Sequence, residues 1–329
     1  MHDARYFFTH IMKTAGTSFI RYAARNFTPA EMWGVGERID AQRFPLLHGT
    51  IDQLFKAEPE LIRRLANTGP RFFEGHMPHA ASAALRVPGR PLRCLALLRE
   101  PVQRVSSHLV FDQRTLARWV LSWRNDRGLD MPMPPESPER LYDDPDWRAS
   151  VGCNLQVKAF AMTEAEVFSG RNPADPEIDL AVKAVTAPST EDRVQAAQQL
   201  LEKHEQALSR TGSLWHRVLH SFGSTPPLQR VYVVDNEKYE RACRVLESID
   251  VIGLTEQLGD FPDVLTWRLG WPKQSMPLAN ATPSPLALSP ALRRRISREN
   301  EADIAFYAFA RRLVARRRQQ RMRRYVLFG

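Results

Sequence analysis

The segment Tyr6–Ser18, YFFTHIMKTAGTS, constrains the fold of this chain more than any other stretch. It opens with an apolar, aromatic-rich run that ends at Met12, and such a run is typical of a short buried strand. Small residues then form a loop over Lys13–Ser18, and apolar residues recur at helical spacing through residues 19–23. The sequence therefore predicts a strand, a tight loop and a helix in immediate succession.

A loop between a strand and a helix N-terminus is well suited to bind an anion. The free N–H groups of the first helical turn and the positive end of the helix dipole meet at one place, and phosphate suits such a site. Lys13 would add a mobile positive charge, and nearby hydroxyl groups would donate hydrogen bonds. The residues predicted to surround a bound phosphate group are Lys13, Thr14, Ala15, Gly16, Thr17 and Ser18.

This loop differs from the phosphate loop of nucleoside triphosphatases. That loop has the pattern G-x-x-x-x-G-K-[ST], in which the lysine follows the second glycine. Here the loop has one glycine, Gly16, and Lys13 precedes it. A simple Gly-Thr-Ser helix start remains an alternative interpretation of the same residues.

Later segments predict further strands and an α/β architecture. Leu92–Leu98, LRCLALL, is a continuous apolar run, as expected for a central parallel strand that is buried on both faces. A long helical pattern follows from Pro101, because proline is favoured at the first helical position. Shorter strands are predicted at 71–76, 231–234 and 251–254. Strands that alternate with helices favour a parallel sheet with helical crossovers.

Polar residues that could bind a second phosphate follow the central strand. Arg99 lies directly after it, at the carboxyl end where open α/β sheets bind ligands, and Ser107 lies on the helix that follows. Arginine offers a planar fork to phosphate, and serine adds a hydroxyl donor. Arg104 and His108 flank the pair and could contribute. The alternative is a helix start at Glu100, with Arg99 in a surface ion pair.

In these two motifs the chain resembles sulfotransferases that use 3′-phosphoadenosine 5′-phosphosulfate (PAPS). The order K-T-A-G-T-S resembles their 5′-phosphosulfate loop, and LREPVQRVSSHLVF, residues 98–111, resembles their 3′-phosphate motif. The resemblance implies an α/β fold with a P-loop-like central parallel sheet, flanking helices and helical additions at the C-terminus. It also implies that PAPS is the sulfuryl donor, with Lys13–Ser18 at its 5′ end and Arg99 and Ser107 at its 3′-phosphate.

A third motif, Glu74-Gly75-His76, resembles that of carbohydrate sulfotransferases of the heparan and chondroitin 2-O type. In that family a Gly-His at a strand end supplies the catalytic base, so the resemblance implies this role for His76. A near-neutral imidazole suits the deprotonation of an acceptor hydroxyl. His48 and His79 are expected to be structural, which is the alternative for His76 as well. The strand's period would turn Glu74 only approximately toward the imidazole of His76.

Lys13 joins His76 as a predicted catalytic residue, because its charge would stabilise the oxygen from which the sulfuryl group departs. The chain departs from the family pattern at Met12, since proline usually precedes the loop lysine. Further similarity to the family is found in three later segments, at residues 153–156, 252–256 and 300–307.

A single domain is predicted over residues 1–329. Residues 125–150, rich in proline and acidic side chains, are predicted to form an insertion or lid. Residues 272–290, rich in proline, serine and alanine, are predicted to be an extended surface connection. Residues 291–324 are predicted to form a basic C-terminal helix.

The charge of the chain predicts anionic partners. The formal net charge is +9, and much of the excess lies in Arg311–Arg324. The predicted acceptor is a hydroxyl group of a carbohydrate or glycoconjugate, with an anionic saccharide as one option, and no specific nucleic-acid ligand is expected. The basic segment could also be the solvated face of a helix. Two other functions remain as alternatives: a nucleotide kinase, disfavoured by the missing Gly-Lys-[Ser/Thr], and a basic polyanion-binding protein.

Neither a metal site nor a membrane span is predicted. The three cysteines, Cys94, Cys153 and Cys243, lie far apart without metal-binding spacing, so no metal cofactor is expected. No run approaches the ~20 apolar residues that a membrane span needs, and the N-terminus lacks a secretory signal pattern. We expect a soluble cytoplasmic enzyme of bacterial type.

Overall fold

The computed structural model describes residues 4–34, 42–43, 48, 51–52, 54–56, 58–128, 133, 135, 137–168, 175–210, 233–277, 279 and 288–328. At its centre is a four-stranded parallel sheet with the strand order β2-β1-β3-β4. The strands are β1 Arg5–Thr9, β2 Phe72–Gly75, β3 Leu92–Leu98 and β4 Val251–Leu254. Because all pairs are parallel, the carboxyl ends of the four strands meet at one edge of the sheet.

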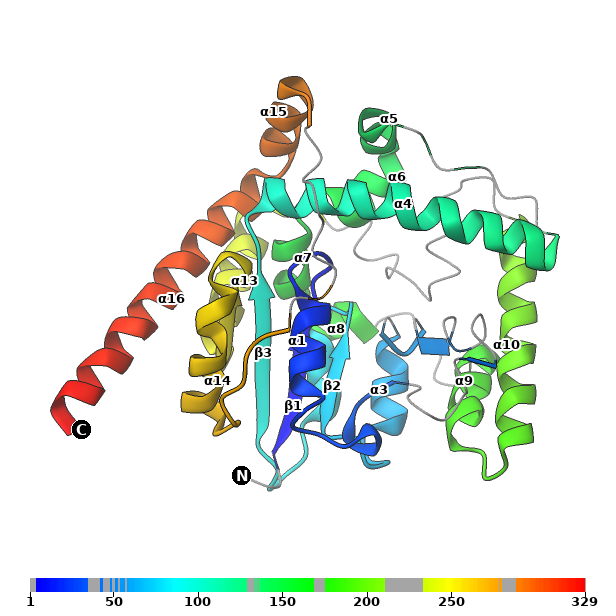
Figure 1. The fold of residues 1–329 in the computed structure, drawn as a ribbon, viewed down its shortest axis with the longest axis horizontal. Coiled ribbons are helices and arrows are strands. Elements are labelled where there is room, and N and C mark those ends of the chain that lie inside the picture. The colour runs from blue at the N-terminus through cyan, green and yellow to red at the C-terminus, as the bar shows by residue number, and fades with distance from the viewer. Residues whose placement is uncertain are drawn as a thin grey trace.

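Helices surround the sheet and cross its carboxyl edge (Figure 1). The α-helices of the described chain are α1 Gly16–Ala23, α3 Pro59–Leu65, α4 Pro101–Arg127, α5 Pro138–Asp143, α6 Pro145–Trp147, α7 Leu155–Ala161, α8 Glu164–Phe168, α9 Pro176–Thr186, α10 Thr190–Arg210, α13 Asn236–Ser248, α14 Phe261–Leu269, α15 Pro290–Glu299 and α16 Glu301–Phe328. Shorter helical turns are η1 Pro29–Glu31, η3 His79–Leu85, η4 Arg148–Gly152 and η5 Thr255–Asp260. The parallel α/β architecture predicted from the sequence is confirmed.

Strand β1 divides the core into two layers, because successive side chains of a strand point to opposite faces. Tyr6 and Phe8 pack in one apolar cluster with residues of α1 and α14. Phe7 packs on the other face, in a larger cluster that includes residues of α7, α13 and α16. All three aromatic side chains are buried. The aromatic run at the start of the chain therefore holds both helical layers to the sheet.

Helix α4 begins directly after β3 and lies across the ends of the strands (Figure 1). Pro101 occupies its first turn, and the carboxylate of Glu100 accepts hydrogen bonds from the backbone N–H groups of Val102 and Gln103. This cap satisfies donors that a helix start leaves free. The corner places the first turns of α4 beside the loop that follows β1.

The C-terminal helix differs from the single helix predicted from the sequence. It is divided at Asn300 into α15 and α16, and α16 continues to Phe328. The amide of Asn300 donates to the carbonyl oxygen of Ile296 at 3.0 Å and accepts a bond from the backbone N–H of Asn154 at 2.9 Å. This contact with a distant segment fixes a non-helical backbone at Asn300, which local helical spacing does not reveal.

Three other predicted segments are partly described. In the 125–150 segment, α5 and α6 bury Leu141 and Trp147 in a cluster with the start of α4. The start of the 272–290 segment, over the described residues 272–277 and 279, lies beside α1, where the hydroxyl of Tyr22 donates to the carbonyl oxygen of Pro272. Residues 231 and 232 lie outside the described residues, and residues 233 and 234 belong to no strand. Among the described helices, none combines the length and apolar character required to cross a lipid bilayer.

Candidate functional site

The loop after β1 has the backbone shape of an anion site. Lys13 and Ala15 have positive φ angles of 68° and 69°, which side-chain-bearing residues seldom adopt. Left-handed residues that alternate with ordinary ones turn successive N–H groups toward a common concave side. Ala15 is also the residue that precedes α1, and among the described residues no side chain caps that helix. The first N–H groups of α1 thus remain available for an anionic ligand.

Gly16 is required at the start of α1 because the ring of His10 packs directly against it. A Cβ atom at this position would overlap the imidazole of His10. His10 directly follows β1, and its ring stacks on Phe8 with 5.3 Å between ring centroids. The glycine of the loop therefore brings the helix start and a buried histidine into contact.

Gly16→Ala is expected to lower the free energy of unfolding by about 1–3 kcal/mol, the usual cost of overpacking a filled site. Urea unfolding of the variant measures this loss. Gly259→Ala is the matched control, because a Cβ at Gly259 meets no atom within 4 Å. Equal, small losses for both variants would contradict the close packing of His10 on Gly16.

His10 belongs to a buried charged network that the sequence did not reveal. Its Nδ1 lies 2.9 Å from Oε2 of Glu74, and Lys56 Nζ lies 3.6 Å from the other carboxylate oxygen. Burial raises the pKa of Glu74, but Lys56 and His10 outweigh it and hold that pKa at about 2. Glu74 consequently orients His10, not His76. The register that pairs Thr9 with Gly75 explains why residues at the ends of two strands meet.

His76 lies next to His10, with 4.3 Å between the ring centroids. Its Nδ1 is 2.8 Å from the backbone carbonyl oxygen of His10. Because a carbonyl can only accept, Nδ1 must carry the proton, and Nε2 then holds a free lone pair. Burial and the nearby His10 lower the pKa of His76 to about 3. The imidazole is therefore neutral at physiological pH.

Arg99 lies at the end of β3 and is held through its backbone. The side-chain amide of Gln156 accepts from the N–H of Arg99 at 3.0 Å and donates to its carbonyl oxygen at 2.9 Å. The guanidinium Nη1 donates to the carbonyl oxygen of Lys13 at 3.2 Å, which ties this side chain to the loop after β1. Its Nε is buried and has no hydrogen-bond partner among the described residues. Arg99 thus retains a donor for a ligand.

The first turns of α4 add further unmet hydrogen-bonding capacity. Arg104 is fully buried, and its Nη2 donates to the carbonyl oxygen of Val151 at 2.8 Å. Its Nε and Nη1, together with Nδ1 of His108, find no partner within the described part of the chain. Burial lowers the pKa of Arg104, and Arg99 lowers it further. Ser107 is half-buried on the same helix. An anion beside Arg99 would supply acceptors that this region lacks.

Lys13 extends over α4. Its Nζ lies 2.8 Å from the ring centroid of Phe111. Burial lowers the pKa of Lys13 to about 7, although Asp112 partly offsets this change. Burial raises the pKa of Asp112 to about 7, and the indole N–H of Trp147 donates to its carboxylate at 2.7 Å. Lys13 is therefore a poorly solvated amine beside a poorly solvated acid, a pairing typical of functional sites.

The hydroxyl groups of the loop are less available than the sequence suggested. The Thr14 hydroxyl donates to the carbonyl oxygen of Ile11 at 2.8 Å, and the Ser18 hydroxyl accepts from the N–H of Ala279 at 3.0 Å. Both residues are buried. Thr17 is half-buried at the start of α1. The backbone N–H groups and Lys13 are consequently stronger candidates for ligand contact than the Thr14 and Ser18 hydroxyls.

Three later segments, which resembled the sulfotransferase family in sequence, form hydrogen bonds with residues that adjoin this site. Asp303 accepts from the backbone N–H groups of Gln156 and Val157 and so caps α7. The Glu256 carboxylate accepts from the N–H of Glu100 at 3.0 Å and from the hydroxyl of Tyr307. These contacts fix the corner between β3 and α4. His79 lies apart, buried, with its Nδ1 3.1 Å from the hydroxyl of Thr9.

The predicted residues thus converge at the carboxyl ends of β1, β2 and β3. His10, Phe111, Asp112 and Trp147 complete the group, and none of these four was predicted from the sequence to belong to the site. Among the described residues, no cluster of three or more His, Cys, Asp or Glu side chains could hold a metal ion. No known protein family's sequence profile matches the chain, and no curated protein is detectably similar to it.

Proposed function

We propose that this protein is a sulfotransferase that moves the sulfuryl group of PAPS to an acceptor hydroxyl. The proposal rests on one observation: two candidate anion-binding sites, each with a basic side chain, and one neutral histidine lie together at the carboxyl edge of the sheet. The first anion site is the loop of Lys13 and the start of α1. The second is Arg99 with the adjoining turns of α4.

The residues present suit a nucleotide with phosphate groups at both ends of its ribose. The loop N–H groups and Lys13 would hold the 5′ end, while Arg99 and Ser107 would hold the 3′-phosphate. The unpartnered Nε of Arg99 and the unmet donors of Arg104 support the second assignment, because a buried N–H donor without an acceptor is costly. When bound, PAPS would supply an activated sulfuryl group on an anionic leaving group. As part of the same proposal, the central parallel sheet is assigned to the P-loop-like type.

His76 is assigned as the base that removes the proton of the acceptor hydroxyl. Its hydrogen bond to the carbonyl oxygen of His10 holds the proton on Nδ1 and leaves Nε2 as the acceptor. Its lowered pKa keeps this lone pair unprotonated. Glu74 would hold His10 through their ion pair. His10 would in turn position His76, because the two imidazole rings are in contact.

Lys13 is assigned to stabilise negative charge on the oxygen that the sulfuryl group leaves. Its pKa is lowered by burial in the ligand-free protein, and an anionic ligand would raise that pKa again. The amine would then be protonated when it is needed. A kinase is less well supported, because the Gly-Lys-[Ser/Thr] sequence that serves magnesium and phosphate is missing.

The acceptor is proposed to be a carbohydrate or glycoconjugate hydroxyl. The support is the resemblance of Glu74-Gly75-His76 to the carbohydrate 2-O type, together with a net charge of +9 that favours anionic saccharides.

Arg99→Ala is expected to remove most of the preference for a 3′-phosphate. Calorimetric titration would compare 3′-phosphoadenosine 5′-phosphate (PAP) with AMP. Because a charge-assisted hydrogen bond contributes roughly 1.5–3 kcal/mol, PAP affinity should fall by more than tenfold while AMP affinity changes little. Arg93→Ala is the control, since Arg93 lies on β3, which Arg99 directly follows, and forms an exposed ion pair with Asp250. A parallel loss of affinity for both nucleotides would refute the 3′-phosphate assignment of Arg99.

A further inference from the structure

Lys56 contacts the end of β2 at two points, although it lies in a separate segment of the chain. Its backbone carbonyl oxygen accepts from the N–H of His76 at 2.6 Å. Its side-chain Nζ lies 3.6 Å from Oε1 of Glu74. Gly75 lies between these two residues, and a Cβ atom on it would lie 2.5 Å from the carbonyl oxygen of Lys56. The glycine therefore allows Lys56 to approach the strand end closely.

The side chain of Lys56 forms ion pairs with Asp52 and Glu74. The side chains of Lys56 and Asp52 are each 22% exposed, whereas that of Glu74 is only 4% exposed. Burial lowers the pKa of Lys56, but Glu74 and Asp52 outweigh this effect and raise that pKa above its usual value. Lys56 is therefore a stable cation beside a buried carboxylate. Among the neighbours that lower the pKa of Glu74, Lys56 has the largest effect.

The contacts of Glu74 continue through His10 to His76. Oε2 of Glu74, the oxygen that does not face Lys56, lies 2.9 Å from Nδ1 of His10. An ionised carboxylate can only accept, so Nδ1 of His10 carries a proton. The ring of His10 contacts that of His76, and its backbone carbonyl oxygen accepts from Nδ1 of His76 at 2.8 Å. Lys56 thus reaches His76 by two routes, one through its backbone and one through Glu74 and His10.

We propose that Lys56 is a positioning residue, which pairs with Glu74 and so holds His10 and His76 in the arrangement that the base requires. Without a cation at position 56, the buried carboxyl group of Glu74 would take up a proton more readily. A protonated carboxyl group can donate, and it would no longer hold the proton of His10 on Nδ1. The effect of Lys56 on turnover rests on the proposed function, whereas its effect on the two histidines does not.

Lys56→Met tests this role, because it removes the charge and keeps the backbone carbonyl group that His76 binds. Turnover should fall by about 10–100-fold, since a small displacement of a reacting group can cost about 10²-fold. PAP affinity, measured by calorimetry, should stay unchanged, because Lys56 belongs to neither anion site. Lys56→Arg keeps the charge and should retain most of the turnover.

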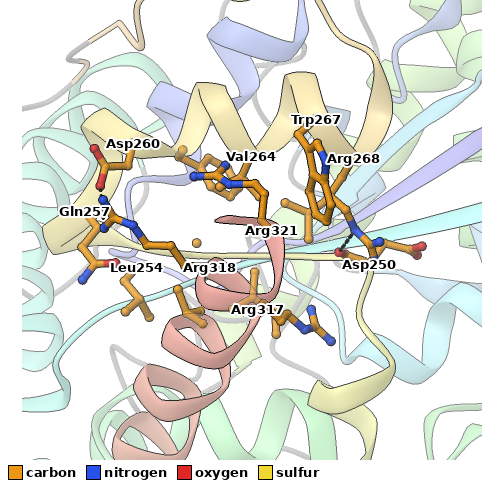
Figure 2. A pocket seen from close by; sticks show the side chains of 15 residues that line it. Asp250, Leu254, Gln257, Asp260, Val264, Trp267, Arg268, Arg317, Arg318 and Arg321 are labelled. Atoms are coloured by element: carbon orange, nitrogen blue, oxygen red, sulfur yellow. Dashed lines mark hydrogen bonds and ion pairs between the residues drawn. The ribbon is translucent and has the colours of Figure 1, made fainter. Parts of the chain in front are cut away.

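Arg318→Met is the matched control, because it removes one positive charge from an ion pair far from Glu74. Arg318 pairs with Asp260 beside the hollow between α14 and α16 (Figure 2). This hollow is lined by β4, which lies at the opposite end of the sheet from β2. Turnover and PAP affinity should both stay unchanged in Arg318→Met.

Two NMR measurements follow the arrangement of the side chains and need no activity. The carboxyl carbon of Glu74, assigned through Glu74→Gln, should stay ionised throughout the pH range in which the wild-type protein is folded. In Lys56→Met it should titrate at higher pH, because losing a nearby cation raises a carboxyl pKa by about 1–3. Proton–nitrogen spectra of protein with isotope-labelled histidine should place the proton of His76 on Nδ1 in the wild type and in Lys56→Arg. Lys56→Met should show a mixture of the two tautomers.

Two further variants separate this role from general support of the fold. Asp52→Asn breaks the outer ion pair but leaves Lys56 facing Glu74, so turnover and the tautomer of His76 should change little. Should Lys56→Met fail to fold, it is combined with Glu74→Gln, which leaves no buried carboxylate unpaired. The double variant should turn over at the rate of Glu74→Gln alone, because Lys56 acts through Glu74.

Other results would overturn the proposal. An unchanged tautomer of His76 in Lys56→Met, or unchanged turnover, would show that Glu74 and His10 hold the base without Lys56. Equal losses in Lys56→Met and Asp52→Asn would assign both residues to local support of the fold. A double variant slower than Glu74→Gln would mean that Lys56 acts directly on a ligand. A wild-type protein without PAP-dependent turnover would refute the proposed function alone, and a tautomer change in Lys56→Met would still support the positioning of His76.

Discussion

Replacing His76 with alanine is expected to lower turnover by about 10²–10⁴-fold, the usual loss when a general base is removed. Nucleotide affinity should stay near that of the wild-type protein, because His76 contacts neither anion site. Within the described residues, the only hydrogen bond of its side chain goes to the backbone carbonyl oxygen of His10. Steady-state kinetics with calorimetry of PAP binding would measure both quantities on the same preparation.

A glutamine at position 76 separates the chemical role from a structural one. Its amide N–H could still donate to the carbonyl oxygen of His10, but glutamine cannot accept a proton. His76→Gln should therefore fold as well as the wild-type protein and lose turnover as completely as His76→Ala. Substantial activity in His76→Gln would assign the residue to positioning, and another group would have to act as the base.

The pH dependence of turnover gives an independent check on the same residue. An unperturbed histidine has a pKa near ~6.5, and a base of that kind would cause activity to fall below about pH 6.5. Burial and His10 lower the pKa of His76 to about 3, so the base stays unprotonated well below that point. The acid limb of kcat/KM that belongs to His76 should lie far below pH 6. A limb at pH 6.5 that disappears in His76→Ala would contradict the buried setting of this imidazole.

Replacing Lys13 with alanine is expected to have the second large effect, with a different signature. Turnover should fall by about 10²–10³-fold, comparable to the loss of one group that stabilises charge in a transition state. Nucleotide affinity should fall as well, because the amine would contact the bound anion before and during transfer. His76→Ala serves as the comparison, since it lowers turnover alone. Unchanged PAP affinity in Lys13→Ala would remove the lysine from the first anion site.

The ligand-free environment of Lys13 sharpens this expectation. Burial lowers its pKa to about 7, whereas an exposed lysine stays protonated throughout the neutral range. PAP binding should therefore be accompanied by proton uptake at pH 8, as the ligand raises the pKa of the amine. Calorimetry in buffers of different ionisation enthalpy measures this uptake. Its absence in Lys13→Ala, together with its presence in His76→Ala, would assign the proton to Lys13.

Local sequence was sufficient to predict the strands that carry the site. The apolar run Leu92–Leu98 was predicted with the same limits that β3 has, and the aromatic run before the loop corresponds to β1. Such runs succeed because a strand covered on both faces needs apolar side chains at nearly every position. The loop was predictable because it consists mainly of small residues. One of them, Gly16, packs against a neighbour that a Cβ atom would not allow.

The partners within the site could not be predicted, because they depend on contacts between distant segments. Glu74 pairs with His10 only because β1 and β2 lie side by side in a particular register. Burial raises the pKa of Asp112, and the hydrogen bond from Trp147, which partly offsets this rise, comes from a segment whose proline and acidic content suggested an exposed insertion. The break at Asn300 likewise depends on Asn154. Each of these features is a product of tertiary packing and has no local pattern.

The central claim is that two separate anion sites hold the two ends of one nucleotide. Calorimetric titration of the wild-type protein with PAP, AMP and magnesium-ATP tests it most directly. The account predicts that PAP binds at least tenfold more tightly than AMP, because the charge-assisted hydrogen bonds of Arg99 to a 3′-phosphate contribute roughly 1.5–3 kcal/mol each. It also predicts that PAP needs no magnesium and binds more tightly than magnesium-ATP. Equal affinity for PAP and AMP, or tighter binding of magnesium-ATP, would contradict it.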